Sequence, residues 1–288
     1  DLLRGTELDD VIDARGGNDR ILGRGGNDLL IGGMGNDALD GGAGNDELRG
    51  GAGADTFTIS GTAIASDADS ITGGTGTDTI SIDNSAAGVT ADFTTAVVSG
   101  IENITVAANA GNVVITTDNA LLTAAGTVTV NAEALATTFT LNFDGSGETT
   151  GATSLFNVTG GAAADTITGG SGNDILAGGS GNDTITSGAG ADSLTGGTGN
   201  DQFVLAGNLT TADTISGGAE SADEITTSTA LAAGSFSNTT GVETLTASGT
   251  GLTWSLAADA STAGITTVTM STGTNSLTLA AGFANAAT

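Results

Sequence analysis

Two consecutive nonapeptides, GGMGNDALD at residues 32–40 and GGAGNDELR at residues 41–49, hold the pattern that decides the fold of this 288-residue chain. Each has glycines before an Asp and an apolar residue, here Leu39 or Leu48, two positions after that Asp. The pattern recurs in two blocks with a constant spacing. The Asp residues at this spacing are Asp10, Asp19, Asp28, Asp37, Asp46 and Asp55 in the first block, and Asp165, Asp174, Asp183, Asp192 and Asp201 in the second.

Each nonapeptide predicts a glycine-rich turn followed by a very short strand. Glycine accepts the positive φ that tight turns require, whereas the residues after the Asp alternate as they do in a strand. So short a strand is unstable alone, but stacked turns pair their backbone groups and collect the apolar side chains into one narrow core. We therefore predict an all-β fold, a parallel β-solenoid or β-roll, with two nonapeptides in each coil.

This geometry predicts which Asp residues become neighbours. The Asp of one repeat should face the Asp two repeats later across a gap between loops. Carboxylates stacked in this way repel one another, so a cation is needed between them. The expected pairs are Asp10 with Asp28, Asp28 with Asp46, Asp19 with Asp37, Asp37 with Asp55, Asp165 with Asp183, Asp183 with Asp201, and Asp174 with Asp192.

The available ligands select the cation. The chain has no Cys and no His, which are the usual zinc ligands, and it offers carboxylate and backbone carbonyl oxygens instead. Calcium accepts roughly 6–8 oxygen ligands in flexible geometry, whereas magnesium demands a near-ideal octahedron. We expect Ca²⁺, on the order of ten ions. The predicted ligands are Asp10, Asp19, Asp28, Asp37, Asp46, Asp55, Asp78, Asp165, Asp174, Asp183, Asp192 and Asp201.

An Asn precedes many of these Asp residues, for example Asn27, Asn36 and Asn182. Asn tolerates the left-handed backbone conformation better than most residues do. We interpret it as a turn residue and not as a metal ligand.

The net charge of −28, from 33 acidic and 5 basic residues, opposes a compact metal-free state because the carboxylates repel one another. We therefore expect folding and calcium binding to be one event. Weak loop sites of this kind fill in millimolar extracellular calcium and stay mostly empty in a cytosol. This favours a secreted, extracellular or cell-surface protein, and we find no apolar run long enough to span a bilayer.

The basic residues exclude some partners. All five are arginines within the first fifty positions, and they form no basic patch. Nucleic acid and anionic membranes are therefore poor partners.

The order of segments indicates a tandem duplication. Gly100-Ile101-Glu102 matches Gly241-Val242-Glu243, and Ala68-Asp69-Ser70-Ile71 matches Ala212-Asp213-Thr214-Ile215. We expect a piece of a longer array with four parts. These are a first β-roll block at 1–81, a Thr/Val-rich β segment at 82–159, a second β-roll block at 160–226 and a second Thr/Val-rich β segment at 227–288.

Enzymatic functions are poorly supported. Without His, Cys, Tyr or Lys, the chain lacks the usual nucleophile arrangements and their common substitutes. A glycosidase with paired carboxylates remains formally possible, and its candidate residues are Glu102, Glu133, Glu148 and Glu243. However, Glu102 and Glu243 occupy matching places in the two copies, which favours a structural role. We predict no catalytic residues and no enzyme.

The repeats 32–40 and 41–49, with GGSGNDILA at 169–177 and GGTGNDQFV at 196–204, resemble the nonapeptides of the RTX, or repeats-in-toxin, family. This resemblance implies a parallel β-roll, calcium-driven folding outside the cell and type I secretion, as in a Gram-negative bacterium. The chain departs from the pattern at several places, such as Arg15 and Ala163, where glycine is usual. The sites that involve those loops are less well defined by the pattern.

The segments that follow the blocks, with GIENITV at 100–106 and GVETLTA at 241–247, are similar to RTX-type bacterial surface-layer proteins. The resemblance implies a secreted calcium-binding structural protein that self-assembles, as a homo-oligomer, into a lattice, surface layer or filament. Two alternatives stay open. The chain could be the calcium-rigidified stalk of a large RTX adhesin, or the secretion and folding module of an RTX enzyme or toxin.

Overall fold

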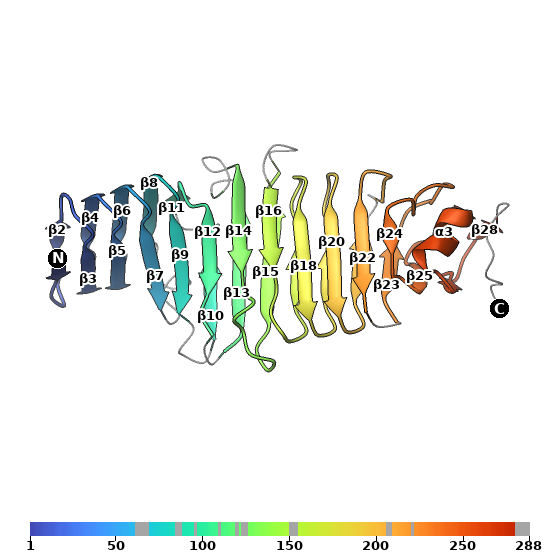
Figure 1. The fold of residues 1–288 in the computed structure, drawn as a ribbon, viewed down its shortest axis with the longest axis horizontal. Coiled ribbons are helices and arrows are strands. Elements are labelled where there is room, and N and C mark those ends of the chain that lie inside the picture. The colour runs from blue at the N-terminus through green and yellow to red at the C-terminus, as the bar shows by residue number, and fades with distance from the viewer. Residues whose placement is uncertain are drawn as a thin grey trace.

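The computed structural model describes residues 1–60, 69–83, 88–94, 97–108, 111–118, 121, 126–149, 155–205, 209–219 and 222–279. These residues wind into an elongated roll of short strands, with the N-terminus at one end of the long axis and the C-terminus at the other (Figure 1). Neighbouring coils pair in parallel, as the first coils show in the register Leu3↔Ile21↔Leu39. The predicted all-β parallel β-solenoid is confirmed.

Twelve of the described strands form one sheet that runs the length of the roll. In spatial order they are β1 (Leu2–Arg4), β3 (Arg20–Gly25), β5 (Ala38–Ala43), β7 (Thr56–Ser60), β9 (Thr79–Asp83), β12 (Asn103–Val106), β14 (Thr127–Asn131), β16 (Leu155–Thr159), β18 (Ile175–Ser180), β20 (Ser193–Thr198), β22 (Thr214–Gly218) and β24 (Thr239–Thr240).

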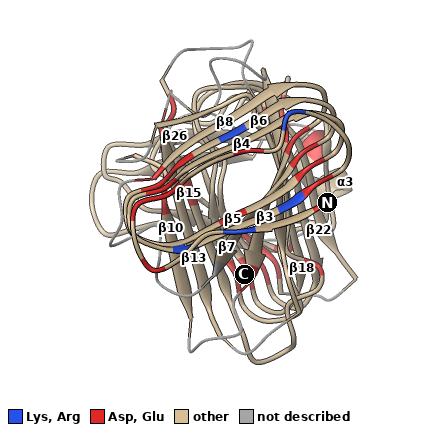
Figure 2. Ribbon diagram, turned by 90° about the vertical axis from the view of Figure 1, so that its left-hand side faces the viewer, with Lys and Arg blue, Asp and Glu red and all other residues tan. Residues whose placement is uncertain are grey.

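The opposite wall of the roll is divided between two sheets among the described residues. The first contains β2 (Val11–Asp13), β4 (Leu29–Met34), β6 (Glu47–Ala52), β8 (Ser70–Thr75) and β11 (Val97–Ser99). The second contains β10 (Val89–Asp92), β13 (Val113–Asp118), β15 (Leu141–Gly147), β17 (Thr166–Thr168), β19 (Thr184–Thr186), β21 (Gln202–Leu205), β23 (Glu224–Thr227), β25 (Thr244–Ala247) and β27 (Thr267–Thr269). Figure 2 looks along the roll from its N-terminal end and shows the two walls facing each other.

The C-terminal coils end differently. Strands β26 (Thr253–Leu256) and β28 (Ser276–Leu279) pair with each other, and the short helix α3 (Ala258–Ala263) precedes β27. Gly264 ends this helix with φ 107°, a left-handed conformation that suits glycine. The sequence did not indicate this helix.

The apolar residue two positions after each Asp forms the core. On the long sheet, Ile21, Leu39, Phe57 and Ile80 follow one another in register and are fully buried. The opposite wall contributes an equivalent column, which includes Leu30 and its neighbours. Strand alternation turns the intervening residues outward.

Several strands are longer than predicted, because the first two glycines of the next repeat belong to them. Strand β4 extends through Gly32 and Gly33, and Gly33 pairs with Gly51 of β6. The glycines therefore serve both as strand residues and as the start of the turn. The boundary between strand and turn lies within the repeat and not at its first glycine.

The long sheet passes through residues 82–159 without interruption, from β9 through β12 and β14 to β16 and β18. The Thr/Val-rich segment thus continues the same solenoid. The four ranges expected from the sequence stay a prediction, since the coils follow one another across these limits. Within the described part of the chain, no helix is long and apolar enough to cross a membrane.

The stacked core makes a testable prediction. Ile185 is fully buried and lies in register between Ile167 and Phe203. Ile185→Ala should lower the free energy of unfolding by about 2–5 kcal/mol, because it leaves a cavity in a narrow core. Urea denaturation in saturating calcium measures this change. Thr184→Ala, on the outward face of the same strand, should lower it by less than about 1 kcal/mol. Equal losses in the two variants would contradict the assigned strand faces.

Candidate metal centre

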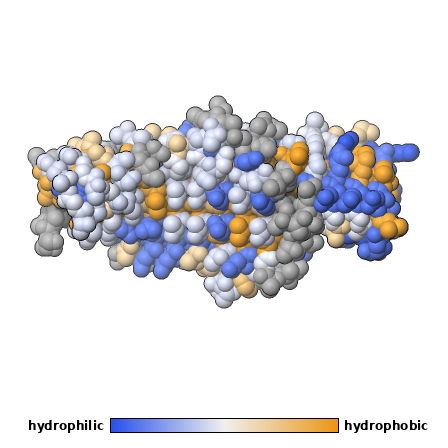
Figure 3. All heavy atoms as spheres, turned by 180° about the vertical axis from the view of Figure 1, so that it is seen from behind, coloured by the Kyte–Doolittle hydropathy of each residue, from blue (hydrophilic) through white to orange (hydrophobic). Residues whose placement is uncertain are grey.

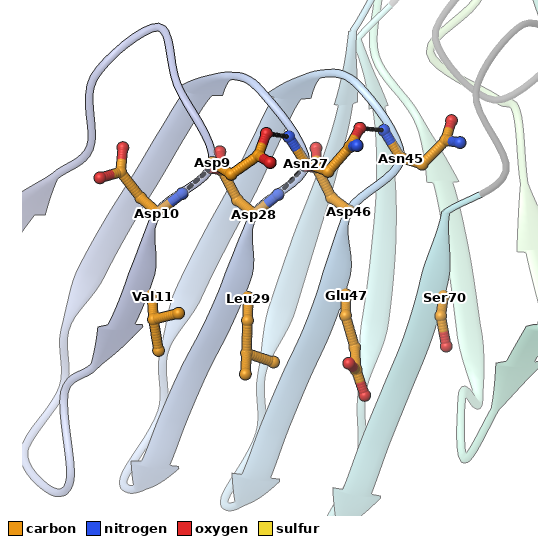
Figure 4. Close-up of a pocket in the computed structure, with 10 residues that line it drawn as sticks. All are labelled: Asp9, Asp10, Val11, Asn27, Asp28, Leu29, Asn45, Asp46, Glu47 and Ser70. Carbon is orange, nitrogen blue, oxygen red and sulfur yellow. Dashed lines mark hydrogen bonds between the residues drawn. The ribbon is translucent and has the colours of Figure 1, made fainter.

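The acidic residues of the repeats stack into rows along the edges of the roll. Each Asp directly precedes a strand, and, after the first Asp of a row, its Oδ1 accepts a hydrogen bond from the backbone N–H of the Asp one coil earlier. In the first row, Asp10 donates to Asp28, Asp28 to Asp46, and Asp46 to Asp69, with N···O distances of 2.8–2.9 Å. Figure 4 shows Asp10, Asp28 and Asp46 of this row side by side.

Three further rows have the same arrangement. The second row contains Asp19, Asp37, Asp55 and Asp78 and ends at Glu102, the third contains Asp165, Asp183, Asp201 and Asp223 and ends at Glu243, and the fourth contains Asp174, Asp192 and Asp213. Every expected pair of neighbours is present. The contact differs from the expectation, however. A carboxylate meets a backbone N–H and does not face a second carboxylate, so one oxygen of each Asp already has a partner.

The rows include acids that the spacing did not reveal. Asp69, Asp213 and Asp223 lie outside the regular nine-residue spacing because insertions separate them from the preceding repeat. Each is still followed by one residue and then a buried Ile, as in Asp69-Ser70-Ile71. That local signal could have found them.

The second carboxylate oxygen, Oδ2, marks the candidate cation sites. On several of the Asp residues, which are at most 5% exposed, Oδ2 is buried. This oxygen accepts no hydrogen bond from the described part of the protein. A buried charged oxygen without a partner is destabilising by roughly 1–3 kcal/mol or more. Residues with this orphaned oxygen are Asp19, Asp28, Asp37, Asp55 and Asp78 in the first block, and Asp183 and Asp192 in the second.

The orphaned oxygens converge with backbone carbonyls at the first glycine of each repeat. A Cβ on Gly23 would overlap both Oδ2 of Asp28 and the carbonyl oxygen of Gly41, which lies one coil later. Gly50 has the same relation to Asp55 and Gly73. The space beside each of these glycines is thus bordered by hard oxygen donors of the kind that calcium prefers.

The next glycines of the turn adopt positive φ. Gly33 (φ 109°) and Gly35 (φ 121°) lie so close to the carbonyls of Arg15 and Gly17 that a side chain would overlap them. Arg15 (φ 70°) and Arg24 (φ 86°) replace glycine at this position and are the non-glycine residues with positive φ in the described ranges. Both arginines keep the left-handed conformation of the loop, which destabilises the fold by about 1–2 kcal/mol per residue relative to glycine.

The Asn residues do not have the conformation that we expected. None of those described has positive φ. Instead, the side-chain Oδ1 of Asn27 accepts a hydrogen bond from the N–H of Asn45 (2.9 Å), and Asn182 accepts one from Asn200 in the same way (2.9 Å). Figure 4 shows the bonds from Asn27 to Asp9 and from Asn45 to Asn27. The column of Asn residues thus links neighbouring turns through side-chain amide hydrogen bonds. The ability of Asn to adopt a left-handed backbone conformation is not used.

Three of the predicted ligands fit a cation less well. Oδ2 of Asp10 accepts hydrogen bonds from the N–H and hydroxyl of Thr6, and Oδ2 of Asp165 and Asp174 accepts the N–H of Gly161 and Gly170. A donor N–H in this place repels a cation.

The first loops of the second block explain this difference. A Cβ on Gly161 or Gly170 would overlap Leu135 or Glu148, which belong to the preceding Thr/Val-rich segment and not to a repeat. The turns of Gly161 and Gly170 lack the positive φ found at Gly33 and its equivalents.

Burial also changes the acidity of the rows. Burial raises the pKa of Asp183 and Asp192 from the usual 3.8 to about 7. The hydrogen bonds from the backbone N–H groups of Asp165 and Asp174 lower the pKa by less than burial raises it. Neighbouring carboxylates raise the pKa further. A metal-free roll must therefore bind protons or tolerate buried charge.

No cluster of three or more acidic side chains that could hold a metal occurs in the described residues. Each loop brings one or two carboxylates to the site, and backbone carbonyls must supply the remaining ligands. This donor set suits calcium and not a transition metal.

The fold and loops define a parallel β-roll with calcium-binding turns, and comparison with known families agrees. The model of the RTX calcium-binding nonapeptide repeat matches residues 4–39, 31–58, 65–81, 157–185 and 168–203. The chain thus carries RTX calcium-binding nonapeptide repeats in both blocks. Asp69 and Asp78 lie inside the matched ranges, whereas Asp213, Asp223, Glu102 and Glu243 lie outside them. No match was found among the curated proteins.

The close contact at the first glycine can be tested by adding one methyl group. Gly23→Ala should lower stability in calcium by about 1–3 kcal/mol, because the Cβ overlaps Asp28 Oδ2 and the Gly41 carbonyl. A calcium titration followed by circular dichroism measures the shift. Gly16→Ala is the control, since its Cβ would lie 3.5 Å from Met34 O, an ordinary contact, and neither glycine has positive φ. A similar shift in both variants would contradict the site.

The raised pKa values predict a pH dependence for the metal-free chain. A pKa that is higher in the fold (about 7) than in the unfolded chain (3.8) stabilises the fold at low pH, and this contribution is lost as the pH rises through about 7. Calcium-free protein should therefore have more β structure at about pH 5 than at about pH 8, as measured by circular dichroism.

A double variant provides the control for this pH dependence. Asp183→Asn with Asp192→Asn removes both titrating groups and should flatten the dependence. An unchanged dependence in the double variant would mean that other groups cause it.

Proposed function

We propose that this chain is a secreted calcium-binding structural protein that folds when calcium binds and self-assembles into an extracellular surface layer or filament. The observation that carries the proposal is the set of acidic rows, in which buried carboxylate oxygens lack protein partners along successive coils. Such rows are suited to holding neighbouring coils together through bound ions. They are not suited to catalysis.

Calcium supplies the positive charge that the rows lack. Oδ2 of residues such as Asp28 and Asp55 would hold the ion together with the carbonyl of the glycine on the next coil, while Oδ1 binds the earlier coil. Each site needs two adjacent coils, so the sites do not exist in the unfolded chain. Folding and binding are then coupled, and millimolar calcium outside a cell favours both.

A non-catalytic role is part of the proposal. The sequence has no His, Cys, Tyr or Lys, and three of the four glutamates considered for a glycosidase have structural contacts. Glu102 and Glu243 accept backbone N–H groups of the acidic rows, and Glu148 accepts the N–H of Ser171 (3.0 Å). These carboxylates are engaged in holding loops.

Shape and charge distribution support assembly. The roll is long, and parallel coils repeat along it up to the different C-terminal end (Figure 1). All five arginines lie in the first block, on the coils nearest the viewer in Figure 2, while acidic residues occur along the whole chain. Strongly hydrophilic side chains gather at that end in Figure 3. Val11 (76% exposed) and Met34 (69% exposed) lie on the same end, which offers both charged and apolar groups for contacts between copies.

The elongated shape also favours a second function, the calcium-rigidified stalk of a large adhesin. A continuous sheet along the roll would make it rigid and would hold modules at its two ends a fixed distance apart. Lectin-like or immunoglobulin-like domains in the flanking sequence would support the stalk, whereas further repeats with an anchoring domain would support the coat. A catalytic domain in the flanking sequence would instead indicate the secretion and folding module of an enzyme or toxin.

Electron microscopy tests the proposed assembly. Purified chain in millimolar calcium should form sheets or filaments, which disappear when calcium is chelated, because the folded roll is lost. Magnesium at the same concentration is the control and should not replace calcium. Circular dichroism on the same samples reports folding. Dispersed monomers at high concentration in a sample that has folded with calcium would contradict self-assembly and favour the stalk.

A further inference from the structure

Two short turns outside the nine-residue pattern end the second and third acidic rows. Strand β12 pairs with β9 in the register Asn103↔Thr79, which sets Glu102 beside Asp78. In the second copy, β25 pairs with β23 in the register Thr244↔Glu224, which sets Glu243 beside Asp223. Both glutamates therefore stand where the next Asp of a regular row would stand.

The glycine of each turn takes the place of a repeat glycine. A Cβ on Gly73 would overlap Oδ2 of Asp78 and the carbonyl oxygen of Gly100, which is the same relation that Gly50 has to Asp55 and Gly73. Gly217 repeats this relation with Asp223 and Gly241. Gly100 (φ 66°) and Gly241 (φ 64°) both have left-handed conformations. The carbonyls of these two glycines thus border the same space as those of the regular loops.

The longer Glu side chain compensates for the shorter turn. A regular loop runs from Gly50 to Asp55, whereas this turn runs only from Gly100 to Glu102. Oε2 of Glu102 nevertheless accepts the N–H of Asp78 at 2.7 Å, and Oε2 of Glu243 accepts the N–H of Asp223 at 3.1 Å. In a regular row, Oδ1 of an Asp makes this bond.

An independent observation points to a ligand in the first of these turns. Asp78 is fully buried (0% exposed), and its Oδ2 accepts no hydrogen bond from any described residue. This oxygen is directed toward the space that the Gly100 carbonyl also borders. The rows stop here, because the residues in register on the following coil are Val128 and Thr266, which carry no charge.

From this geometry we infer that the turns Gly100-Ile101-Glu102 and Gly241-Val242-Glu243 each complete a calcium site that terminates an acidic row. Asp78, the Gly100 carbonyl and Glu102 form the first site, and Asp223, the Gly241 carbonyl and Glu243 form the second. All of these donors are oxygens, which calcium prefers. The inference rests on the proposed calcium-dependent folding, but it assigns ions to residues outside the matched repeats.

Substitution by Gln separates a cation ligand from a hydrogen-bond acceptor. Glu102→Gln and Glu243→Gln keep an oxygen that accepts the N–H of Asp78 or Asp223 and remove the charge. Glu133→Gln is the control, since Glu133 is exposed, lies in a Thr/Val-rich segment and loses the same charge. Bound calcium is counted on the full chain by equilibrium dialysis with elemental analysis, and folding is followed by circular dichroism.

Each single variant should bind one ion fewer than the unchanged chain, the double variant two fewer, and Glu133→Gln the same number. Equal calcium binding in all variants would overturn the inference and leave the glutamates as hydrogen-bond acceptors. Failure of the unchanged chain to bind calcium would instead refute the proposed function itself.

A second measurement does not depend on the variants. Anomalous scattering from crystals of the unchanged chain, grown in calcium, should show an ion between Asp78 and Glu102 and another between Asp223 and Glu243. Ions at the regular loops with none at these two places would overturn the inference, even if the Gln variants failed to fold.

Discussion

The structure depends on the burial of like charges in stacked rows. Each coil places an Asp at the edge of the roll, and the next coil places another directly above it. One oxygen of each carboxylate is satisfied by a backbone N–H, but the other, as in Asp37 and Asp55, is buried beside a glycine and accepts no hydrogen bond from the described residues. Protons or divalent cations must neutralise these oxygens. At neutral pH a divalent cation is the effective counterion, because it balances two carboxylates and accepts carbonyl ligands as well.

Other features of the sequence follow from this constraint. The first glycine of a repeat must be glycine, because a Cβ would fill the space between the carboxylate and the carbonyl, as at Gly23. The later glycines must be left-handed, as at Gly33, to bring carbonyls close to the next turn. The core can remain thin because hydrogen bonds between the strands, together with cations in the loops, also hold neighbouring coils together. Aromatic packing is correspondingly limited, and the pair Phe143 and Phe156, with ring centroids 5.0 Å apart, lies in the Thr/Val-rich segment before the second block.

The sequence predicted the parts of the molecule that repeat. The spacing of Asp37, Leu39 and their equivalents gave the parallel roll, the core column and the neighbours in each row. It missed Asp69, Asp213 and Asp223, because insertions in the loops shift their spacing while strand register restores their place in the row. Register is a property of the folded coils and cannot be counted along the chain. The same holds for the first loops of the second block, where contacts with Leu135 and Glu148 change the turns.

The hydrogen bonds along the Asp and Asn columns have opposite directions. An Asp N–H donates to the later coil, as Asp28 does to Asp46, whereas an Asn N–H donates to the earlier coil, as Asn45 does to Asn27. At the end of a row this direction changes: the N–H groups of Glu102 and Glu243 donate back to the carbonyls of Asp78 and Asp223, and the N–H of Asp213 donates to the carbonyl of Thr210. Three of the four acidic rows are therefore closed by their own last residue, so the ladder of N–H donors ends inside the roll and is not passed on to a further coil.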